Sequence, residues 1–398
     1  MKRTVITLLT FFLALINIYA QEAIMNTATK IIKEIKNQYA PDTREAIFEI
    51  SVTDSANFFT LSGETNIPEA KQELLNKLKK LNLSFTDEIH LLPEKDLGDK
   101  IYGLVNLSVE NIRSTPNDRA ELASQALLGT PIKIYKKASE YYLIQTPDDY
   151  IAWIHEDGII LMTKSQLDEW MESEKIIFTK EFGFSYSQPN ELSQRVSDLV
   201  AGNLLLVVGK ENNFFKVKYP DNRIAYVDKL NCESFDTWLE KRNPMGGDIV
   251  ATAKLFMGIP YLWGGTSIKG MDCSGFTKTI YFLNGIVLPR DASQQVNTGI
   301  LVDTKTGFEN LRAGDLLFFG FHATDSTTER VTHVGIYIGD LKFIHDSGRV
   351  KINSLDKNAV DFSEFRLTHF IRAKRILNSI DKNGISSIKK NKFYIGEM

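Results

Sequence analysis

The sequence is poor in cysteine and histidine, and its charges almost cancel. Its 398 residues hold two cysteines and six histidines, and the formal net charge is −3. This balance gives no electrostatic reason to expect a nucleic-acid partner. Four histidines lack the spacing to cysteine or acidic residues that a metal site requires, so neither a metal nor a cofactor is expected. These are His90, His155, His322 and His369.

The two cysteines, Cys232 and Cys273, are predicted to stay unpaired. An exported protein can join two such cysteines, but Cys273 lies in a motif, described below, that requires a free thiol. Cys232 is therefore predicted to be a packing residue.

The remaining composition is that of an ordinary globular protein, with 43% apolar and 24% charged residues. The length predicts two to four domains. We expect a monomer.

Residues 1–20 have the features of an export signal. Two basic residues precede an apolar run over residues 5–20, which ends in the small residue Ala20. The alternative is a transmembrane anchor, but the run is short for a span and polar residues follow it at once. No cysteine lies near the expected cleavage point, so lipid attachment is not expected. The sequence therefore predicts a periplasmic or secreted protein without a stable membrane anchor.

Residues 21–98 are predicted to form a small α/β region. Residues 46–52, 58–61 and 88–92 have strand-like patterns, and residues 68–81 have helical spacing. We expect an accessory or spacer domain.

An internal repeat organises the middle of the chain. Residues 127–154 can be laid over residues 200–227 at a constant offset of 73, which pairs a glycine with a glycine and a proline with a proline. Both copies consist of short alternating strands broken by Pro, Asp and Asn turns. The repeat predicts two small β-barrels, at residues 99–165 and 176–235.

These barrels resemble bacterial SH3-like domains, whose last strands often read Gly-Tyr-x-Gly-Trp-Val. Residues 149–154 (DYIAWI) fit that pattern in the first copy. The second copy has Arg223 where the first has Tyr150. This difference indicates that only one copy handles ligand, and the alternative is that both copies are scaffolds.

Residues 236–247 are predicted to be a linker. The segment with the candidate chemistry follows at residues 246–376. The last residues, 377–398, are polar and rich in lysine and asparagine, which predicts a loosely ordered tail.

Cys273 is predicted to lie where a loop becomes a helix. It stands within residues 271–276 (MDCSGF), ahead of an apolar pattern with helical period. Unpaired backbone N–H groups and the helix dipole at such a junction favour an anion. They would lower the pKa of the thiol and favour the nucleophilic thiolate. Gly275 allows a crowded first turn.

Two histidines are predicted on neighbouring strands. His333 begins the apolar strand at residues 332–339, and His345 lies in the next strand, after a tight turn at Gly339 and Asp340. On antiparallel neighbours such a pair can lie side by side on one face. One imidazole can then take the thiol proton while the other orients its ring.

The ordered set of Cys273, His333 and His345 resembles the NlpC-type cell-wall peptidases, a papain-like family. The resemblance covers about 125 residues of this chain. It implies an α+β fold, in which a papain-like domain follows the two SH3-like barrels and the small α/β region. It also implies that Cys273 is the nucleophile, His333 the general base and acid, and His345 the residue that orients His333. The Cys273 backbone N–H would hold part of the oxyanion.

The domain order, with two SH3-like barrels ahead of such a domain, resembles that of the γ-D-glutamyl-L-diamino-acid endopeptidases. The resemblance implies cleavage between γ-D-Glu and a diamino acid in murein peptides with a free N-terminal L-Ala. The first alternative is a hydrolase of intact peptidoglycan, with the barrels as wall-binding modules. The second is a non-catalytic binding protein, which the complete Cys-His-His set argues against.

The same resemblance implies a set of substrate-binding residues. Glu121 and Tyr150 of the first barrel combine an acidic group and a phenol, which suit an ammonium terminus. The remaining implied positions are Trp263, Asp272, Ser274, Asp291 and Ser293.

Overall fold

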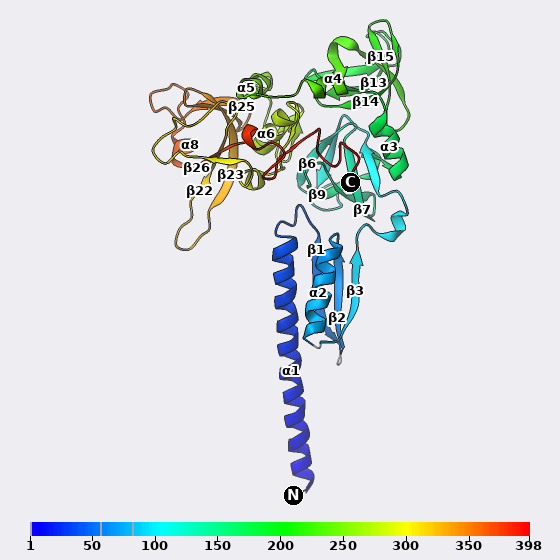
Figure 1. Ribbon diagram of the computed structural model, residues 1–398, viewed down its shortest axis with the longest axis vertical. Coiled ribbons are helices and arrows are strands. Elements are labelled where there is room, and N and C mark those ends of the chain that lie inside the picture. The colour runs from blue at the N-terminus through cyan, green and yellow to red at the C-terminus, as the bar shows by residue number, and fades with distance from the viewer. Residues whose placement is uncertain (1, 56–57, 82) are drawn as a thin grey trace. The chain divides into compact units, whose positions relative to one another are not determined.

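The computed structural model describes residues 2–55, 58–81 and 83–398 (Figure 1). The chain divides into two compact units, with the boundary between Gly98 and Asp99.

The first unit is a small α/β domain. Its sheet has the order β1-β2-β3, in which β1 pairs antiparallel with β2, and β2 pairs parallel with β3. Helix α2 makes the crossover that a parallel pair requires. It starts at Pro68, whose missing N–H costs nothing at the first turn. The elements are α1 (Lys2–Tyr39), β1 (Phe48–Ser55), β2 (Phe58–Thr65), α2 (Pro68–Lys80), β3 (Phe85–Leu91) and the 3₁₀ turn η1 (Lys95–Leu97).

Helix α1 continues well beyond the predicted export signal. Its C-terminal half contributes Ile31 and Ile35 to the core of this domain, together with Leu74 and Leu78 of α2. Among the described residues, none of the helices combines the length and the apolar character that a membrane span requires.

The second unit begins with two seven-stranded sheets of the same topology. The first has the order β10-β4-β7-β8-β9-β5-β6, and the second has the order β17-β11-β14-β15-β16-β12-β13. Every strand of the second starts 73 residues after its counterpart in the first. The strands of the first barrel are β4 (Tyr102–Val105), β5 (Val109–Arg113), β6 (Leu122–Leu127), β7 (Pro131–Ala138), β8 (Tyr141–Gln145), β9 (Ile151–His155) and β10 (Ile159–Met162). Those of the second barrel are β11 (Lys175–Phe178), β12 (Phe182–Tyr186), β13 (Arg195–Val200), β14 (Leu204–Glu211), β15 (Phe214–Lys218), β16 (Ile224–Asp228) and β17 (Cys232–Ser234).

The paired glycines of the repeat have a structural reason. Gly129 and Gly202 both take a positive φ in the turn between the third and fourth strands of their barrels. A Cβ atom on Gly129 would also lie 2.5 Å from the carbonyl oxygen of Leu204, where the second barrel approaches the first.

Each barrel is followed by a short helix, α3 (Lys164–Glu172) and α4 (Phe235–Glu240). The prediction of a linker at residues 236–247 is wrong in its first half, because α4 buries Trp238 against Phe235 with stacked rings. A helix of six residues is too short for its apolar period to be recognised in the sequence.

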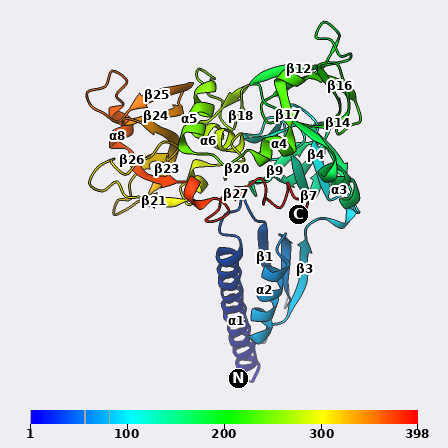
Figure 2. The same cartoon turned by 45° about the horizontal axis from the view of Figure 1, so that its top comes forward.

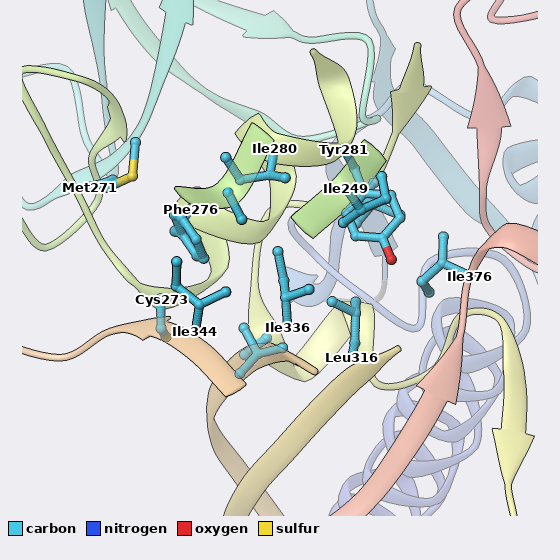
Figure 3. Close-up of a cluster of buried hydrophobic side chains, with 14 of the residues drawn as sticks. Ile249, Met271, Cys273, Phe276, Ile280, Tyr281, Leu316, Ile336, Ile344 and Ile376 are labelled. Atoms are coloured by element: carbon cyan, nitrogen blue, oxygen red, sulfur yellow. The ribbon is translucent and has the colours of Figure 1, made fainter. Parts of the chain in front are cut away.

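The C-terminal domain packs helix α6 (Cys273–Phe282) against a six-stranded antiparallel sheet with the order β21-β26-β22-β23-β24-β25. Phe276 and Ile280 of α6 face Ile336 and Ile344 of the sheet in a closed apolar core (Figure 3). The strands of the sheet are β21 (Ile300–Val302), β22 (Leu316–Phe321), β23 (Arg330–Gly339), β24 (Lys342–Asp346), β25 (Val350–Ser354) and β26 (Phe370–Arg375). The other elements are α5 (Gly246–Leu255), β18 (Thr266–Ser267), β19 (Gly270–Met271), β20 (Ile286–Val287), α7 (Ala292–Gln295) and α8 (Glu364–Thr368).

The last residues form an ordered strap, and the prediction of a loosely ordered tail is wrong. Strand β27 (Ser386–Ser387) pairs with β20, and Phe393 is fully buried. Asn391 Nδ2 donates a hydrogen bond of 2.8 Å to the carbonyl oxygen of Pro147 in the first barrel. Strand pairing, the burial of Phe393 and this hydrogen bond together anchor the lysine-rich segment.

Candidate active site

Cys273 is the first residue of α6, as its motif predicts. Asp272 caps this helix, since its Oδ1 accepts a hydrogen bond of 2.7 Å from the N–H of Gly275. The first turn is as crowded as predicted, because a Cβ atom on Gly275 would lie 2.0 Å from the carbonyl oxygen of Gly265.

The thiol of Cys273 is buried, with 6% of the residue exposed. Burial raises its pKa to about 12, and the negative charge of Asp272 adds to this effect. The backbone N–H groups of Val334 and Ser274 act in the opposite direction but do not compensate. The pKa shift is therefore opposite to the one that the helix start alone predicts, and the thiol is neutral in the free protein.

The structure brings His333 of β23 and His345 of β24 together. His333 Nε2 lies 2.7 Å from His345 Nδ1, and the two rings are nearly perpendicular. His345 Nε2 in turn lies 2.9 Å from Oδ1 of Asn353 on β25. Three adjacent strands thus supply one line of polar groups.

This line determines which ring nitrogens carry protons. The amide of Asn353 is oriented by its Nδ2, which donates to the carbonyl oxygen of Asp361 at 3.0 Å, so its Oδ1 must accept. His345 therefore carries its proton on Nε2 and accepts on Nδ1. His333 then donates through Nε2, which leaves its Nδ1 with a free lone pair.

Both imidazoles are held neutral. Burial lowers the pKa of His333 well below its usual value, and the positive charge of Arg366 lowers it further. Burial likewise lowers the pKa of His345 to about 3, although the hydrogen bond that His345 donates to Asn353 acts in the opposite direction. These pKa shifts favour the neutral form of the thiol and of both imidazoles.

Glu121 and Trp263 join the first barrel to the loop before α6. Trp263 Nε1 donates a hydrogen bond of 2.6 Å to Glu121 Oε1, and both side chains remain accessible, with 63% of Trp263 exposed. Tyr150 is buried in the same barrel, and its phenol acts electrostatically on Arg290.

Arg290 connects these predicted positions, although of its loop only Asp291 and Ser293 were predicted to bind substrate. Its guanidinium is 1% exposed, and it donates to Asp272 Oδ2 at 2.6 Å, to Ser274 Oγ at 3.1 Å and to Ser124 Oγ of the first barrel at 3.1 Å. It therefore holds the residues on both sides of Cys273 against the barrel. Nothing in the local sequence distinguishes a buried arginine from an exposed one in this loop.

Asp291 and Ser293 lie in the segment that follows Arg290. Asp291 is the N-terminal cap of α7 and lies 4.0 Å from the Arg290 guanidinium. Ser293 lies on the exposed side of α7. Asp291 therefore lies close to Arg290, whereas Ser293 lies at the surface.

Two further titratable residues of the site, Tyr261 and Asp346, were not predicted from the sequence. The phenol of Tyr261 is within electrostatic range of Cys273, and burial raises its pKa. Asp346 is fully buried, and both of its carboxylate oxygens lack a hydrogen-bond donor among the residues that the structure describes. Burial raises the pKa of Asp346 to about 7. The sequence offered one indication of Asp346, because this carboxylate directly follows His345, a predicted site residue.

Comparisons with known proteins agree with this architecture. Residues 258–367 match the NlpC/P60 family, and residues 112–159 match the bacterial dipeptidyl-peptidase SH3 domain. The match to the SH3 domain covers residues of the first barrel, and the second barrel has the same strand order as the first.

The chain is 31% identical over 233 residues to a gamma-D-glutamyl-L-lysine dipeptidyl-peptidase of Bacillus cereus, covering 56% of this chain and 67% of that protein. It is 26% identical over 268 residues to dipeptidyl-peptidase 6 of Lysinibacillus sphaericus, covering 64% and 92%. A solved structure of an NlpC/P60 family protein from Bacillus cereus has the same fold, with a TM-score of 0.60 and 24% identity over 69% of this chain and 99% of that one. On this similarity, together with the site built around Cys273, the chain belongs to the NlpC/P60 family.

Proposed function

We propose that the protein is a cysteine endopeptidase that cleaves murein peptides between γ-D-Glu and a diamino acid, and that it requires a free N-terminal L-Ala. The observation that carries the proposal is the hydrogen bond by which Glu121 of the first barrel reaches the loop leading to the candidate nucleophile. The names of the relatives, gamma-D-glutamyl-L-lysine dipeptidyl-peptidase and dipeptidyl-peptidase 6, support this assignment.

In the proposed reaction, Cys273 Sγ attacks the carbonyl carbon of the γ-glutamyl bond while His333 Nδ1 takes the thiol proton. The proton positions derived from the Asn353 amide support this role, since they leave Nδ1 of His333 as the acceptor. Because thiol and imidazole both start neutral, proton transfer accompanies the attack and does not precede it.

The remaining steps use the same groups. The backbone N–H of Cys273, at the start of α6, is the proposed donor to the oxyanion. His333 returns its proton to the leaving amine, and a water molecule then hydrolyses the thioester with His333 as base. His345 and Asn353 are proposed as positioning residues that keep His333 in the required tautomer.

Glu121 and Tyr150 are the proposed ligands of the substrate ammonium, with Trp263 and Asp291 beside them. The accessible carboxylate of Glu121 supports this role. Asp272 and Ser274 are proposed to shape the site through Arg290, since both accept hydrogen bonds from its guanidinium. Ser293, on the exposed side of α7, is proposed to contact substrate only at the rim.

We also propose that the protein acts as a monomer in the periplasm or outside the cell, after cleavage of residues 1–20. The basic start and apolar run of this segment support export. Mass measurement of the protein recovered from an exporting host, with size-exclusion chromatography, tests both statements.

The decisive experiment compares free L-Ala-γ-D-Glu-diaminopimelate, its N-acetylated form and intact sacculi, with products identified by mass. The proposal expects release of L-Ala-γ-D-Glu from the free peptide only, and no products with Cys273→Ala. Efficient release of stem fragments from intact sacculi would instead favour the peptidoglycan hydrolase with wall-binding barrels.

A further inference from the structure

Arg366 places a positive charge beside the candidate active site, on the side away from the first barrel. It lies on α8, and Figures 1 and 2 both show α6 between α8 and strand β9 of that barrel. Among the residues that the structure describes, its guanidinium has one long hydrogen bond, 3.5 Å to Ser347 Oγ, and no ion pair. In contrast, Arg290 on the barrel side is neutralised by Asp272.

Aromatic rings hold the Arg366 guanidinium in place. It lies over Phe319 and Phe365, 5.6 and 5.5 Å from the ring centroids. The Phe319 ring also packs against His333, with 5.9 Å between centroids. Stacking of this kind orients an arginine without using its hydrogen-bond donors. The outer donors of Arg366 therefore remain available to a ligand.

The charge of Arg366 reaches the reacting groups. It lowers the pKa of both His333 and His345, and a thiolate at Cys273 would in turn stabilise its protonated form. The Phe319 ring contacts both the Arg366 guanidinium and the His333 ring, so a ligand group bound to Arg366 would lie near the candidate base.

We propose that Arg366 binds a carboxylate of the residue that hydrolysis releases. This inference rests on the proposed function, in which the substrate N-terminus lies at the first barrel and the scissile carbonyl at Cys273. The leaving residue then extends toward α8. A planar guanidinium with unused donors is suited to bidentate recognition of a carboxylate.

Two carboxylates of a leaving residue have this chemistry. One is the α-carboxylate, which is free when the diamino acid ends the peptide. The other is the side-chain carboxylate of diaminopimelate, which lysine lacks. Three peptides separate them: L-Ala-γ-D-Glu-diaminopimelate, L-Ala-γ-D-Glu-L-Lys and the C-terminal amide of the lysine peptide.

We expect the wild-type kcat/KM to fall about ten- to a hundredfold when the recognised carboxylate is absent. If Arg366 binds the α-carboxylate, only the amide is poor. If it binds the side-chain carboxylate, both lysine peptides are poor. Equal kcat/KM on all three peptides would overturn the inference, whereas no cleavage of any of them would overturn the proposed function itself.

Arg366→Gln should remove this discrimination, and Arg366→Lys should retain part of it. The ratio between peptides is the informative readout, because an indirect effect on His333 would slow all three peptides alike. Arg372→Gln is the matched control, since Arg372 of β26 forms an ion pair with Glu329 and both side chains are partly exposed. If Arg366→Gln discriminated between the three peptides as strongly as the wild type, another group would bind the carboxylate, and the inference would be overturned.

Discussion

The indole N–H of Trp263 donates a hydrogen bond of 2.6 Å to Glu121, a residue 142 positions earlier in the chain. This contact joins the first barrel to the domain that carries Cys273. It places the accessible carboxylate of Glu121 at the barrel end of the candidate active site, where the proposed function requires a group that binds the substrate ammonium.

Glu121→Ala should therefore lower kcat/KM for a peptide with a free N-terminus by about tenfold, since a charge-assisted hydrogen bond at an accessible site is lost. N-acetylation of the peptide should lower kcat/KM in the wild type and have little further effect in the variant. Arg223→Ala in the second barrel is the control, at the position equivalent to Tyr150. Equal rates of the wild type on free and acetylated peptide would rule out an ammonium subsite.

The state of the Cys273 thiol can be followed by alkylation. Cys273→Ala should abolish hydrolysis, and Cys232→Ala should retain most of it, because Cys232 lies in the second barrel. Since burial raises the pKa of Cys273 to about 12, inactivation by iodoacetamide should be slow at pH 7 and accelerate as the pH rises. A rate of inactivation that is already maximal at pH 6 would show a preformed thiolate and contradict the neutral pair.

The line from His333 to Asn353 predicts graded losses of activity. His333→Ala should remove essentially all turnover, because the proposed carrier of the thiol proton is lost. His345→Ala should cost less, and His345→Gln should recover part of the loss by accepting from His333. Asn353→Ala should lower kcat more than it raises KM, since its effect acts through His345. Full activity of His333→Ala would reverse the assignment of the base.

The buried histidines should also make the fold sensitive to acid. The pKa of His345 is about 3 in the folded protein and near 6.5 when unfolded, so between these values the unfolded state binds the extra proton. Stability is therefore unaffected by His345 above pH 6.5 and falls as the pH drops toward 3. We expect a loss of about 2 kcal/mol between pH 7 and pH 5 from such a residue.

Urea unfolding at pH 7 and pH 5 measures this effect. His345→Gln should lose less stability on acidification than the wild type. His322→Gln, at an exposed loop position, should behave as the wild type does. An identical pH dependence in all three proteins would mean that the pKa of His345 is not lowered in the folded protein.

The C-terminal strap should contribute to stability. Phe393 is fully buried, and Phe393→Ala should lower the free energy of unfolding by about 3–5 kcal/mol. Lys389→Ala, at an exposed position of the same segment, should change it by less than about 0.5 kcal/mol. Equal unfolding midpoints for the two variants would show that the strap is not anchored in solution.

Much of the site was predictable because its signals are local. The helix that starts at Cys273 follows from a loop-like segment ahead of an apolar period, and the neighbouring histidines follow from a tight turn between two apolar strands. The constant offset of 73 residues likewise implies two copies of one topology, whatever their environment. The helix start and the turn depend only on residues close in sequence, and the repeat needs only a comparison of the sequence with itself, so the sequence by itself determined all three.

Tertiary structure decided the features that depend on distant neighbours. Arg290 is buried because Ser124 and Asp272 both reach it, and the 377–398 segment is held in place because Phe393 is fully buried. Asn353 is significant only because β25 lies beside β24. The pKa of Cys273 rises rather than falls for the same reason. The helix start is encoded locally, but the burial that outweighs it comes from packing against the sheet.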